Sequence, residues 1–427
     1  MEKRGAVVDY SKLLDELLIR IVENHIVSVI DFINFSCVCH SWRRAANACD
    51  IAKLRTKWPR HQMPWLMLTD GIDGPEVQSK IREATSCPSD KACSIIISNR
   101  ELGLYYSSID PLCCQRSLLN MSWNRNMSYD FNIPEMHGRA CWGSPYGWVV
   151  TLGVDREMYL FNPFTRSRLP LPSQSTFHRD SDSDRDSGYV EIYGPVLSRV
   201  VLLRVPSKYR GVDIDARVCD NYDNDDDVIW LVVVIYTLPM QDVFYCHQMR
   251  SLIFVDGKAN LFYSDLHDPE HPQQIQPYLA GPPITEQIGD KYKCFTLYII
   301  ESNGNILIVN KKTLMGETCM YHTCNFSVYK LDESTKSWEE VNDLQGVSLF
   351  LGLNVSMSIN AKDAGCRSNC IYFCDDLRAF YYGTKISYVG GHDMGVYSMD
   401  DGTIQPLYTG HHSRSSHCCP FWLSPML

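Results

Sequence analysis

The sequence predicts a mainly β protein in which a small α-helical module precedes a large antiparallel β-propeller. One helical apolar pattern lies near the N-terminus, and many short β-type runs separated by turn residues fill positions 64–427. No amphipathic helix of comparable clarity follows residue 64. Radial repetition is the usual way to extend antiparallel sheet over about 360 residues, so a propeller of about six to seven blades is favoured over a sandwich.

The helical module begins with the segment SKLLDELLIRIVEN at 11–24. Apolar residues at positions 13, 14, 17, 18, 21 and 22 follow the spacing of one helix face. Charged residues fill the opposite face, and Ser11 suits the N-cap position. A second apolar pattern continues from Val29 to Ala46, so residues 28–48 are expected to form one or two helices.

The β-type runs are separated by Gly, Asn, Asp and Pro, which are typical of turns between antiparallel strands. They lie at 64–68, 94–98, 147–153, 157–162, 200–205, 228–236, 251–256, 259–265, 296–302, 305–311, 326–332, 370–376 and 395–400. The segment SNGN at 302–305 predicts a hairpin. PWLML near residue 64 and PFWLSP at 420–425 are both predicted to be short strands that lie in the same or neighbouring blades and close the ring.

Composition and net charge argue against several classes of protein: membrane-spanning, secreted and nucleic-acid-binding proteins. No apolar run reaches the ~18 residues needed to cross a bilayer, and the N-terminus has no signal-peptide pattern. A cytoplasmic or nuclear protein is therefore expected rather than a secreted one, and most of the 18 cysteines are expected to be free thiols. The net charge of −10 argues against a nucleic-acid partner. Acidic segments at 178–188 and 219–227 are expected to be surface loops, and residues 51–63 a basic linker.

Four groups of residues contain side chains that can bind metals, but none of them has the pattern of a known metal site. We therefore expect no metal ion and no other cofactor. Cys37, Cys39 and His40 lack a fourth ligand, and on a single helix residues two apart point away from each other. The aspartates of 180–191 imitate a calcium loop but have Arg185 at the position that needs glycine. Cysteines at 366, 370 and 374 have the spacing of one helix face, but their neighbours predict a loop that leads into a strand. The His- and Cys-rich segment 411–420 has no partner cluster at ligand spacing.

The search for catalytic motifs gives no positive ground for an enzyme. The sequence has no G-x-S-x-G elbow, H-E-x-x-H helix, Walker loop or G-x-G-x-x-G loop. Asp375, Asp376 and Asp401 lie at predicted strand ends, where aspartates usually cap turns, so we expect them to be structural. A propeller enzyme with an unrecognised site in the central channel stays open as an alternative.

The N-terminal segment resembles an F-box. That family has a Leu-Pro-x-(Glu/Asp)-Leu-Leu-x-x-Ile helix, followed after an interval by Val-Cys-x-x-Trp-Arg. The matching residues here are Leu13, Leu14, Glu16, Leu17, Leu18 and Ile21, then Val38, Cys39, Trp42 and Arg43. One residue departs from the pattern, since Leu14 stands where the family has proline. We define 8–50 as the F-box-like segment.

The strand-rich remainder, 64–427, resembles the β-propeller of plant KIB-type F-box proteins. The resemblance is carried in chain order by GSPYGWVVTL, LFNPFTRSRLPLP, YIIESNGNILIVNK, FSVYKLDESTKSWEEVNDLQGVSLFLG, NCIYFCDD, GVYSMDDG and PFWLSP. It implies a plant protein that is the non-catalytic, substrate-recognition subunit of a Skp–cullin–F-box ubiquitin ligase. The implied partners are a Skp-type adaptor, through it a cullin, and a target protein on the propeller, with no membrane contact.

The residues expected to bind the adaptor come from the two halves of the F-box pattern. They are Leu13, Leu14, Leu17, Leu18, Ile21, Val38, Cys39 and Trp42. Burying such side chains contributes roughly 1.5–3 kcal/mol each. The alternative is a propeller scaffold or inhibitory partner whose degenerate F-box no longer recruits the adaptor, and the departure at Leu14 is the feature that supports it.

Overall fold

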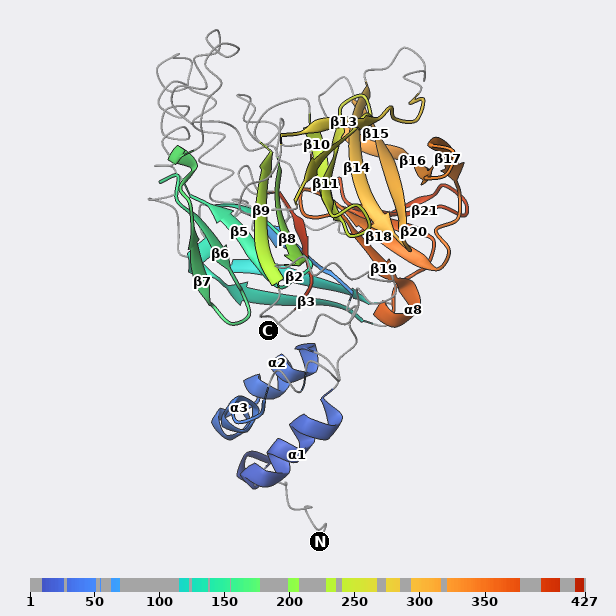
Figure 1. Cartoon of the computed structure of the whole chain (residues 1–427). Coiled ribbons are helices and arrows are strands. Elements are labelled where there is room, and N and C mark those ends of the chain that lie inside the picture. The colour runs from blue at the N-terminus through green and yellow to red at the C-terminus, as the bar shows by residue number, and fades with distance from the viewer. Residues whose placement is uncertain are drawn as a thin grey trace, which may run out of the picture.

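The structure of the 427-residue chain is a computed structural model. It describes residues 10–26, 29–50, 54, 63–69, 115–122, 125–136, 139–153, 155–176, 199–206, 228–235, 240–266, 274–284, 293–315, 321–376, 393–407 and 419–425. Figure 1 shows a unit of helices at the N-terminal end and a β domain made of separate sheets. The expected segments at 94–98, 178–188 and 219–227, and most of 411–420, lie outside the described residues.

Three helices follow the short 3-10 turn η1 (Tyr10–Lys12) in the helical unit: α1 (Asp15–His25), α2 (Val29–Cys37) and α3 (His40–Asn47). The helix predicted at 11–24 is confirmed, but the prediction of Ser11 as its N-cap is wrong. Because η1 takes up residues 10–12, the N-cap residue of α1 is Leu14, whose side chain makes no capping hydrogen bond. Residues 28–48 form two helices, since the backbone is fully extended at Cys39.

The three helices enclose a small apolar core of their own. Its buried members are Leu18, Val22, Ile26, Phe32, Phe35, Ala45, Ala46, Cys49 and Leu54. Leu54 lies in the predicted linker 51–63, whereas Met63 at the end of that segment is buried in the β domain. The described ends of the predicted linker therefore pack with the units on either side.

The described residues of the β domain form six sheets. The first has the order β23 (Phe421–Leu423), β1 (Trp65–Thr69), β2 (Gln115–Ser122), β3 (Arg125–Asn132). The second has the order β4 (Ala140–Trp142), β5 (Val149–Leu152), β6 (Met158–Phe161), β7 (Arg168–Leu171). In the third, the described residues form β8 (Arg199–Pro206) and β9 (Val228–Ile235). Short 3-10 turns, η4 (Pro134–Met136) and η5 (Gln174–Thr176), flank the second sheet in the sequence.

The other three sheets come from the second half of the chain. The fourth has the order β10 (Met240–Cys246), β11 (Ser251–Asp256), β12 (Leu261–Asp265), β13 (Gln276–Leu279). The fifth has the order β14 (Lys293–Ser302), β15 (Asn305–Met315), β16 (Tyr321–Asp332), β17 (Ser337–Val341). The sixth has the order β19 (Met357–Asn360), β18 (Val347–Leu351), β20 (Cys370–Phe373), β21 (Gly395–Ser398), β22 (Ile404–Pro406), and the short helix α8 (Ala361–Ala364) follows β19.

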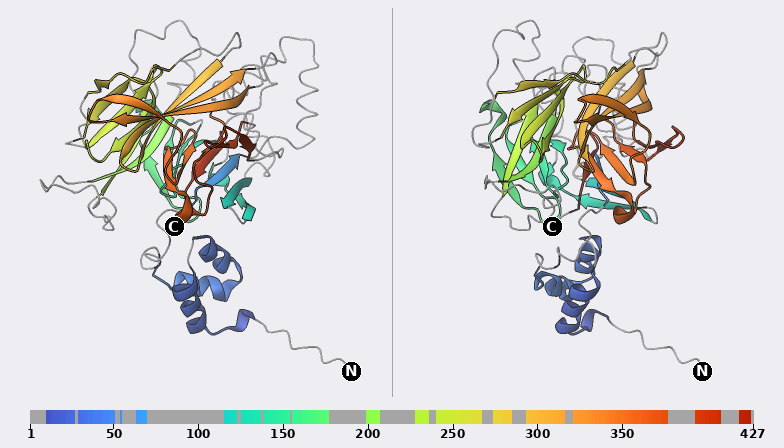
Figure 2. Two further views of the ribbon diagram at one scale, coloured as in Figure 1. Left: turned by 90° about the vertical axis from the view of Figure 1, so that its right-hand side faces the viewer. Right: turned by 45° about the vertical axis from the view of Figure 1, so that its right-hand side comes forward.

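Each sheet packs against two others through apolar clusters, so the six sheets form a ring. Four of them have four strands, one has five and one has two. The mainly β fold is confirmed, but there are fewer complete four-stranded blades than the six to seven predicted. Among the described residues the third sheet has two strands, β8 and β9, and the sixth has five, which include a parallel pair, β18 with β20. Figure 2 shows the sheets around the ring in two further views.

The ring is closed by strands from the two ends of the β domain. β1 pairs antiparallel with β23, with Trp65 opposite Leu423 and Met67 opposite Phe421. The predicted closure by PWLML and PFWLSP is therefore confirmed. The predicted hairpin at 302–305 is confirmed too: Ser302 pairs with Asn305, and Asn303 and Gly304 have φ of 50° and 74°, as a two-residue hairpin turn requires.

Candidate functional site

The helical unit exposes an unusual number of large apolar side chains. Tyr10, Leu14, Leu17 and Val38 are 62%, 69%, 46% and 55% exposed, and we call these four the apolar surface. They are four of the six large apolar side chains exposed among the described residues, although the helical unit is a small part of the chain. Exposed apolar side chains concentrated in one small unit indicate a protein-binding surface.

The eight predicted adaptor-binding residues do not all point outward. Leu14, Leu17 and Val38 are exposed, whereas Leu18 is fully buried in the core of the helical unit. The remaining four, Leu13, Ile21, Cys39 and Trp42, are half-buried. The α1 residues divide because positions 18 and 22 face the core while 14 and 17 face away from it. Tyr10 was missed because it lies before the amphipathic pattern begins.

Trp42 contacts both the segment before α1 and helix α2. Its ring lies 4.5 Å from the ring of Phe35, and its indole Nε1 donates a hydrogen bond to the carbonyl oxygen of Tyr10 at 3.1 Å. Arg44 binds both carboxylate oxygens of Asp15 at 2.7 and 2.9 Å. The segment 10–15, including Leu14, is therefore held along α3 by two contacts. Because the Asp15–Arg44 pair is exposed, solvent screens it and it contributes little to stability.

The structure corrects the argument about Cys37 and Cys39 as joint metal ligands. Cys37 is the last residue of α2, and Cys39 is the N-cap residue of α3. The two cysteines therefore belong to different helices, and the argument from the geometry of a single helix does not apply to them. In the described ranges, no group of three or more His, Cys, Asp or Glu side chains is placed to hold a metal ion. Within those ranges, no helix is long and apolar enough to cross a bilayer.

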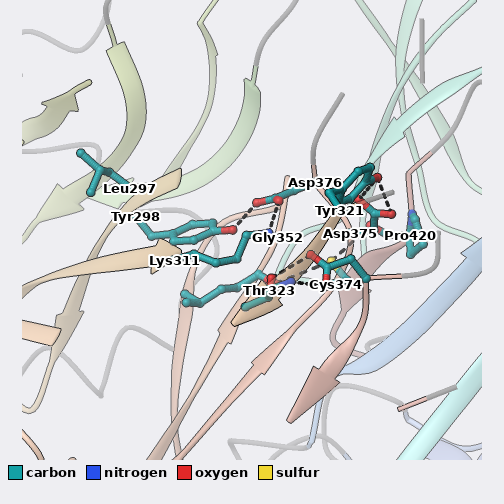
Figure 3. Close-up of polar contacts among 12 residues, drawn as sticks. Leu297, Tyr298, Lys311, Tyr321, Thr323, Gly352, Cys374, Asp375, Asp376 and Pro420 are labelled. Atoms are coloured by element: carbon teal, nitrogen blue, oxygen red, sulfur yellow. Dashed lines mark hydrogen bonds and ion pairs between the residues drawn. The ribbon is translucent and has the colours of Figure 1, made fainter. Parts of the chain in front are cut away.

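A second candidate site is a cluster of buried polar side chains between the fifth and sixth sheets, which we call the polar seam. Tyr298 and Lys311 both donate to the carboxylate of Asp376. The Tyr321 hydroxyl lies 2.8 Å from both carboxylate oxygens of Asp375. Figure 3 shows these side chains reaching from β14, β15 and β16 toward the residues that follow β20.

The polar seam gives two of the predicted turn-capping aspartates a further role. Asp375 and Asp376 directly follow β20, and their carboxylates accept hydrogen bonds from the fifth sheet. Asp393, which precedes β21, likewise accepts from the backbone N–H and the hydroxyl of Thr323 at 2.8 and 2.7 Å. Asp401 does cap a turn, since it accepts from the N–H and hydroxyl of Thr403.

A buried ion pair links four of the sheets. Arg199 on β8 lies 2.7 Å from Asp242 on β10, and both side chains are almost fully buried. Arg199 also donates to the carbonyl oxygens of Gly352 and Asn354, just after β18, at 2.9 and 3.0 Å. Asp242 accepts from the backbone N–H of Ile299 on β14 at 3.0 Å. The third, fourth, fifth and sixth sheets are thus linked by one arginine and one aspartate.

The protonation states of the polar seam are those of a structural network. Burial, the carboxylate of Asp376 and the hydrogen bond to it raise the pKa of Tyr298 well above its usual value, and burial and Asp375 raise that of Tyr321. Burial lowers the pKa of Lys311, but Asp376 and the neighbouring carboxylates outweigh it and raise the pKa overall. None of these three groups is a base near neutral pH. The seam can hold sheets together, and its side chains are closed to solvent.

A ring of sheets closed by strands from both ends, with an attached helical unit, defines this molecule as a β-propeller protein with a candidate docking module. The family model of the KIB1-4 beta-propeller matches residues 118–398. The chain belongs to the KIB1-4 beta-propeller family.

Similar proteins from Arabidopsis thaliana carry F-box names. The chain is 25% identical to the F-box/kelch-repeat protein KIB1 over 55% of its own length and 54% of that protein. It is 22% identical to the F-box protein KIB2, over 88% of this chain and 74% of the relative. It is also 22% identical to the F-box protein SKIP23, over 93% of this chain and 91% of the relative. The matches to KIB2 and SKIP23 extend over most of both proteins, whereas the chain spans about half of KIB1.

Proposed function

We propose that this protein is the substrate-recognition subunit of a Skp–cullin–F-box ubiquitin ligase that acts in the cytosol or nucleus. The helical unit docks a Skp-type adaptor, which connects it to a cullin, and the propeller holds a target protein. The protein itself performs no chemistry. It makes ubiquitin transfer effectively intramolecular by holding the target near the ligase.

The observation that carries this proposal is the apolar surface of the helical unit. Leu14, Leu17 and Val38 belong to the F-box-like pattern, and all three are exposed in the structure. A partner that covers them removes apolar area from water, which contributes roughly 1.5–3 kcal/mol for each side chain. The F-box names of the relatives support the same partner class.

The remaining predicted residues contribute in a different way in this proposal. Leu18 acts through the core of the helical unit, and Trp42 holds Tyr10 in place with its indole N–H. Leu13, Ile21 and Cys39 are half-buried and lie at the margin of the interface. We therefore expect substitutions of Leu18 or Trp42 to weaken adaptor binding by unfolding the unit.

Leu14 no longer favours a degenerate F-box. Its φ is −62°, which is within the range that proline enforces, so leucine already adopts the backbone that the family's proline would impose. Leucine also keeps the exposed apolar area at this position. The alternative of a scaffold or inhibitory partner that does not recruit the adaptor therefore loses its one supporting feature.

The test is a titration of the purified full-length protein with a purified Skp-type adaptor. Leu17→Glu puts a charge into the proposed interface, and we expect at least a ~100-fold loss of affinity because the carboxylate would be buried without a partner. Position 17 lies in the first turn of α1, where an acidic residue suits the helix, so the unit should still fold.

The matched control is Leu169→Glu, since Leu169 on β7 is also a leucine and is 51% exposed. We expect this variant to bind the adaptor as the unchanged protein does. Equal adaptor affinity of the Leu17→Glu variant and the unchanged protein would refute the proposed surface. No binding by the unchanged protein would favour the scaffold alternative.

A further inference from the structure

The two faces of the fifth sheet carry different polar side chains. On β15, Lys311 reaches the sixth sheet and belongs to the polar seam, whereas Ile306 and Ile308 pack toward the fourth sheet. Because side chains alternate along a strand, Asn310 and Lys312 share the face of these two isoleucines. Figure 1 shows β10 and β11 of the fourth sheet beside β14 and β15. Asn310 and Lys312 are therefore separated from the polar seam by the fifth sheet itself.

The unusual side chain on this face is Asn310. It is fully buried, yet neither the nitrogen nor the oxygen of its side-chain amide has a hydrogen-bond partner in the described part of the chain. Its cross-strand neighbours are Leu297 on β14 and Ser327 on β16. A buried amide is costly without hydrogen bonds, so such a group ordinarily meets a protein partner, a water or a ligand. The amide of Asn310 offers both a donor and an acceptor to a bound group.

Three further polar groups lie on the same face as Asn310. The half-buried Lys312 ammonium donates to the hydroxyl of Ser327 at 3.2 Å, and no carboxylate among the described residues lies within ion-pair distance of Lys312. Tyr329 is two residues from Ser327 on β16, and burial and Glu340 raise the pKa of its phenol although a hydrogen bond with Ser327 opposes them. Tyr329 is therefore a protonated donor at neutral pH. We call Asn310, Lys312, Ser327 and Tyr329 the donor cluster.

The chemistry of the donor cluster selects one kind of ligand. An ammonium, two hydroxyls and an amide NH2 all donate hydrogen bonds, and a bond from an ammonium to an anionic oxygen is of the strong, charge-assisted kind. A cation would be repelled by Lys312, and an apolar ligand would leave the amide of Asn310 without hydrogen bonds. Glu340 is opposite Tyr329 on β17, but it is exposed, so solvent screens its charge. A small oxyanion satisfies the cluster best.

We propose that the donor cluster binds a small oxyanion, a phosphate or a carboxylate, at the face of the fifth sheet that meets the fourth. Lys312, which is half-buried, supplies the charge on the solvent side, and Asn310 supplies the amide N–H on the inner side. The bound oxygen gives the Asn310 amide the partner that the protein does not provide. This inference goes beyond the proposed function and does not depend on adaptor binding.

The test is equilibrium dialysis of the full-length protein, without adaptor, against radiolabelled inorganic phosphate in a chloride buffer of constant ionic strength. We expect saturable binding to a single class of site. Sodium acetate is then added as a competitor, with sodium chloride at the same concentration as its control. Displacement of phosphate by acetate would show that a carboxylate is sufficient, and the absence of displacement would assign the site to phosphate.

Two variants place the anion on the donor cluster. Asn310→Leu should weaken phosphate binding at least ~10-fold, and Lys312→Met should do the same. The anion-free Asn310→Leu protein should keep or raise its melting temperature, because a buried amide without a partner is replaced by an apolar side chain of similar shape. An asparagine with a purely structural role would instead lower the melting temperature when replaced.

Two matched controls separate this site from its surroundings. The hydroxyl of Thr313 is also buried without a hydrogen-bond partner among the described residues, but Thr313 is opposite Thr323, which contacts Asp393 of the sixth sheet. Thr313→Val should therefore leave phosphate binding unchanged. Lys330→Met removes the same charge as Lys312→Met from the neighbouring strand β16, and it should also leave phosphate binding unchanged.

Four results would overturn this inference: no saturable phosphate binding, undiminished binding by the Asn310→Leu or Lys312→Met variant, an equal loss in the Lys330→Met variant, or a lower melting temperature of the anion-free Asn310→Leu protein. The third would show that phosphate responds only to overall charge, and the fourth that Asn310 serves the fold. None of these results bears on the adaptor titration, so failure here is distinguishable from failure of the proposed function.

Discussion

The helical unit and the β domain distribute apolar and charged side chains in opposite ways. The helical unit exposes Leu14 and Leu17, and its Asp15–Arg44 ion pair lies on the surface. The β domain buries the ion pair of Lys311 with Asp376 completely. A small unit that leaves apolar area in water is suited to a partner. A ring that encloses charges is suited to holding its own sheets together.

The two units differ because their internal packing is fixed by different kinds of contact. Apolar contacts between sheets are tolerant of sliding, whereas a buried lysine is stable only against the carboxylate that it meets. The polar seam therefore favours one arrangement of the fifth sheet on the sixth. In the helical unit, the apolar core sets the helix packing, and the exposed leucines remain available.

The largest expected effect concerns the buried ion pair between Lys311 and Asp376 in the β domain. Lys311→Met leaves the carboxylate of Asp376 buried without its cation, so we expect the free energy of unfolding to fall by about 3–5 kcal/mol. Lys330→Met is the matched control, because Lys330 is partly exposed and lies 3.8 Å from Glu339, and a change below about 1 kcal/mol is expected. Urea unfolding of both variants measures the difference. Similar losses in the two would show that burial does not set the value of the pair.

The next effect separates two adjacent leucines of α1. Leu18→Ala should destabilise the helical unit by about 2–5 kcal/mol because Leu18 is fully buried. Leu17→Ala should change stability by less than about 0.5 kcal/mol because its side chain is already 46% exposed. Hydrogen exchange of α1 amides reports the stability of this unit. Equal protection in the two variants would contradict the division between core and apolar surface.

The smallest expected effect concerns alkaline pH. The pKa values of Tyr298, Tyr321 and Lys311 are raised in the folded protein. Their contribution to stability is therefore fully present below about pH 10 and is lost as the pH rises further, since the unfolded chain releases these protons first. Tyr321→Phe should cost about 1–3 kcal/mol at neutral pH and flatten the alkaline loss. Melting curves from pH 7 to 11 measure both, and an unchanged alkaline slope in this variant would argue against the assignment.

Much of the helical unit was predictable, but the direction of its side chains was not. A helical stripe at 13–22 includes both Leu17 and Leu18, and periodicity alone does not tell which edge of a broad stripe meets the core. The contacts of α1 with α3 settle it, because they bury Leu18 against Ala45 and Ala46. Tyr10 lies before this stripe, and a hydrogen bond from Trp42, 32 positions away, to its carbonyl oxygen holds it beside α3.

In the β domain, continuous apolar strands were predicted, and two more polar strands were missed. QRSLLNMS of β2 lacks the alternation of a half-buried strand, whereas RNMSYDFN of β3 does alternate through Met127, Tyr129 and Phe131, so β3 was predictable from its sequence. The polar seam was missed for a related reason: aspartates after a strand ordinarily cap turns, and their tertiary partners are 54–78 positions away in the sequence. The four polar residues at 310–313, which interrupt the apolar run of β15, were the available signal.

The sequence by itself determined the order of elements, the separation of helices from strands, and the pairing of the first and last strands that closes the ring. These follow from local periodicity, turn residues and the need to bury apolar runs. Only the tertiary structure decided which leucines of α1 stay exposed and which aspartates meet Lys311 and Tyr321. Those features depend on which segments distant in sequence become neighbours, and local preference does not encode that.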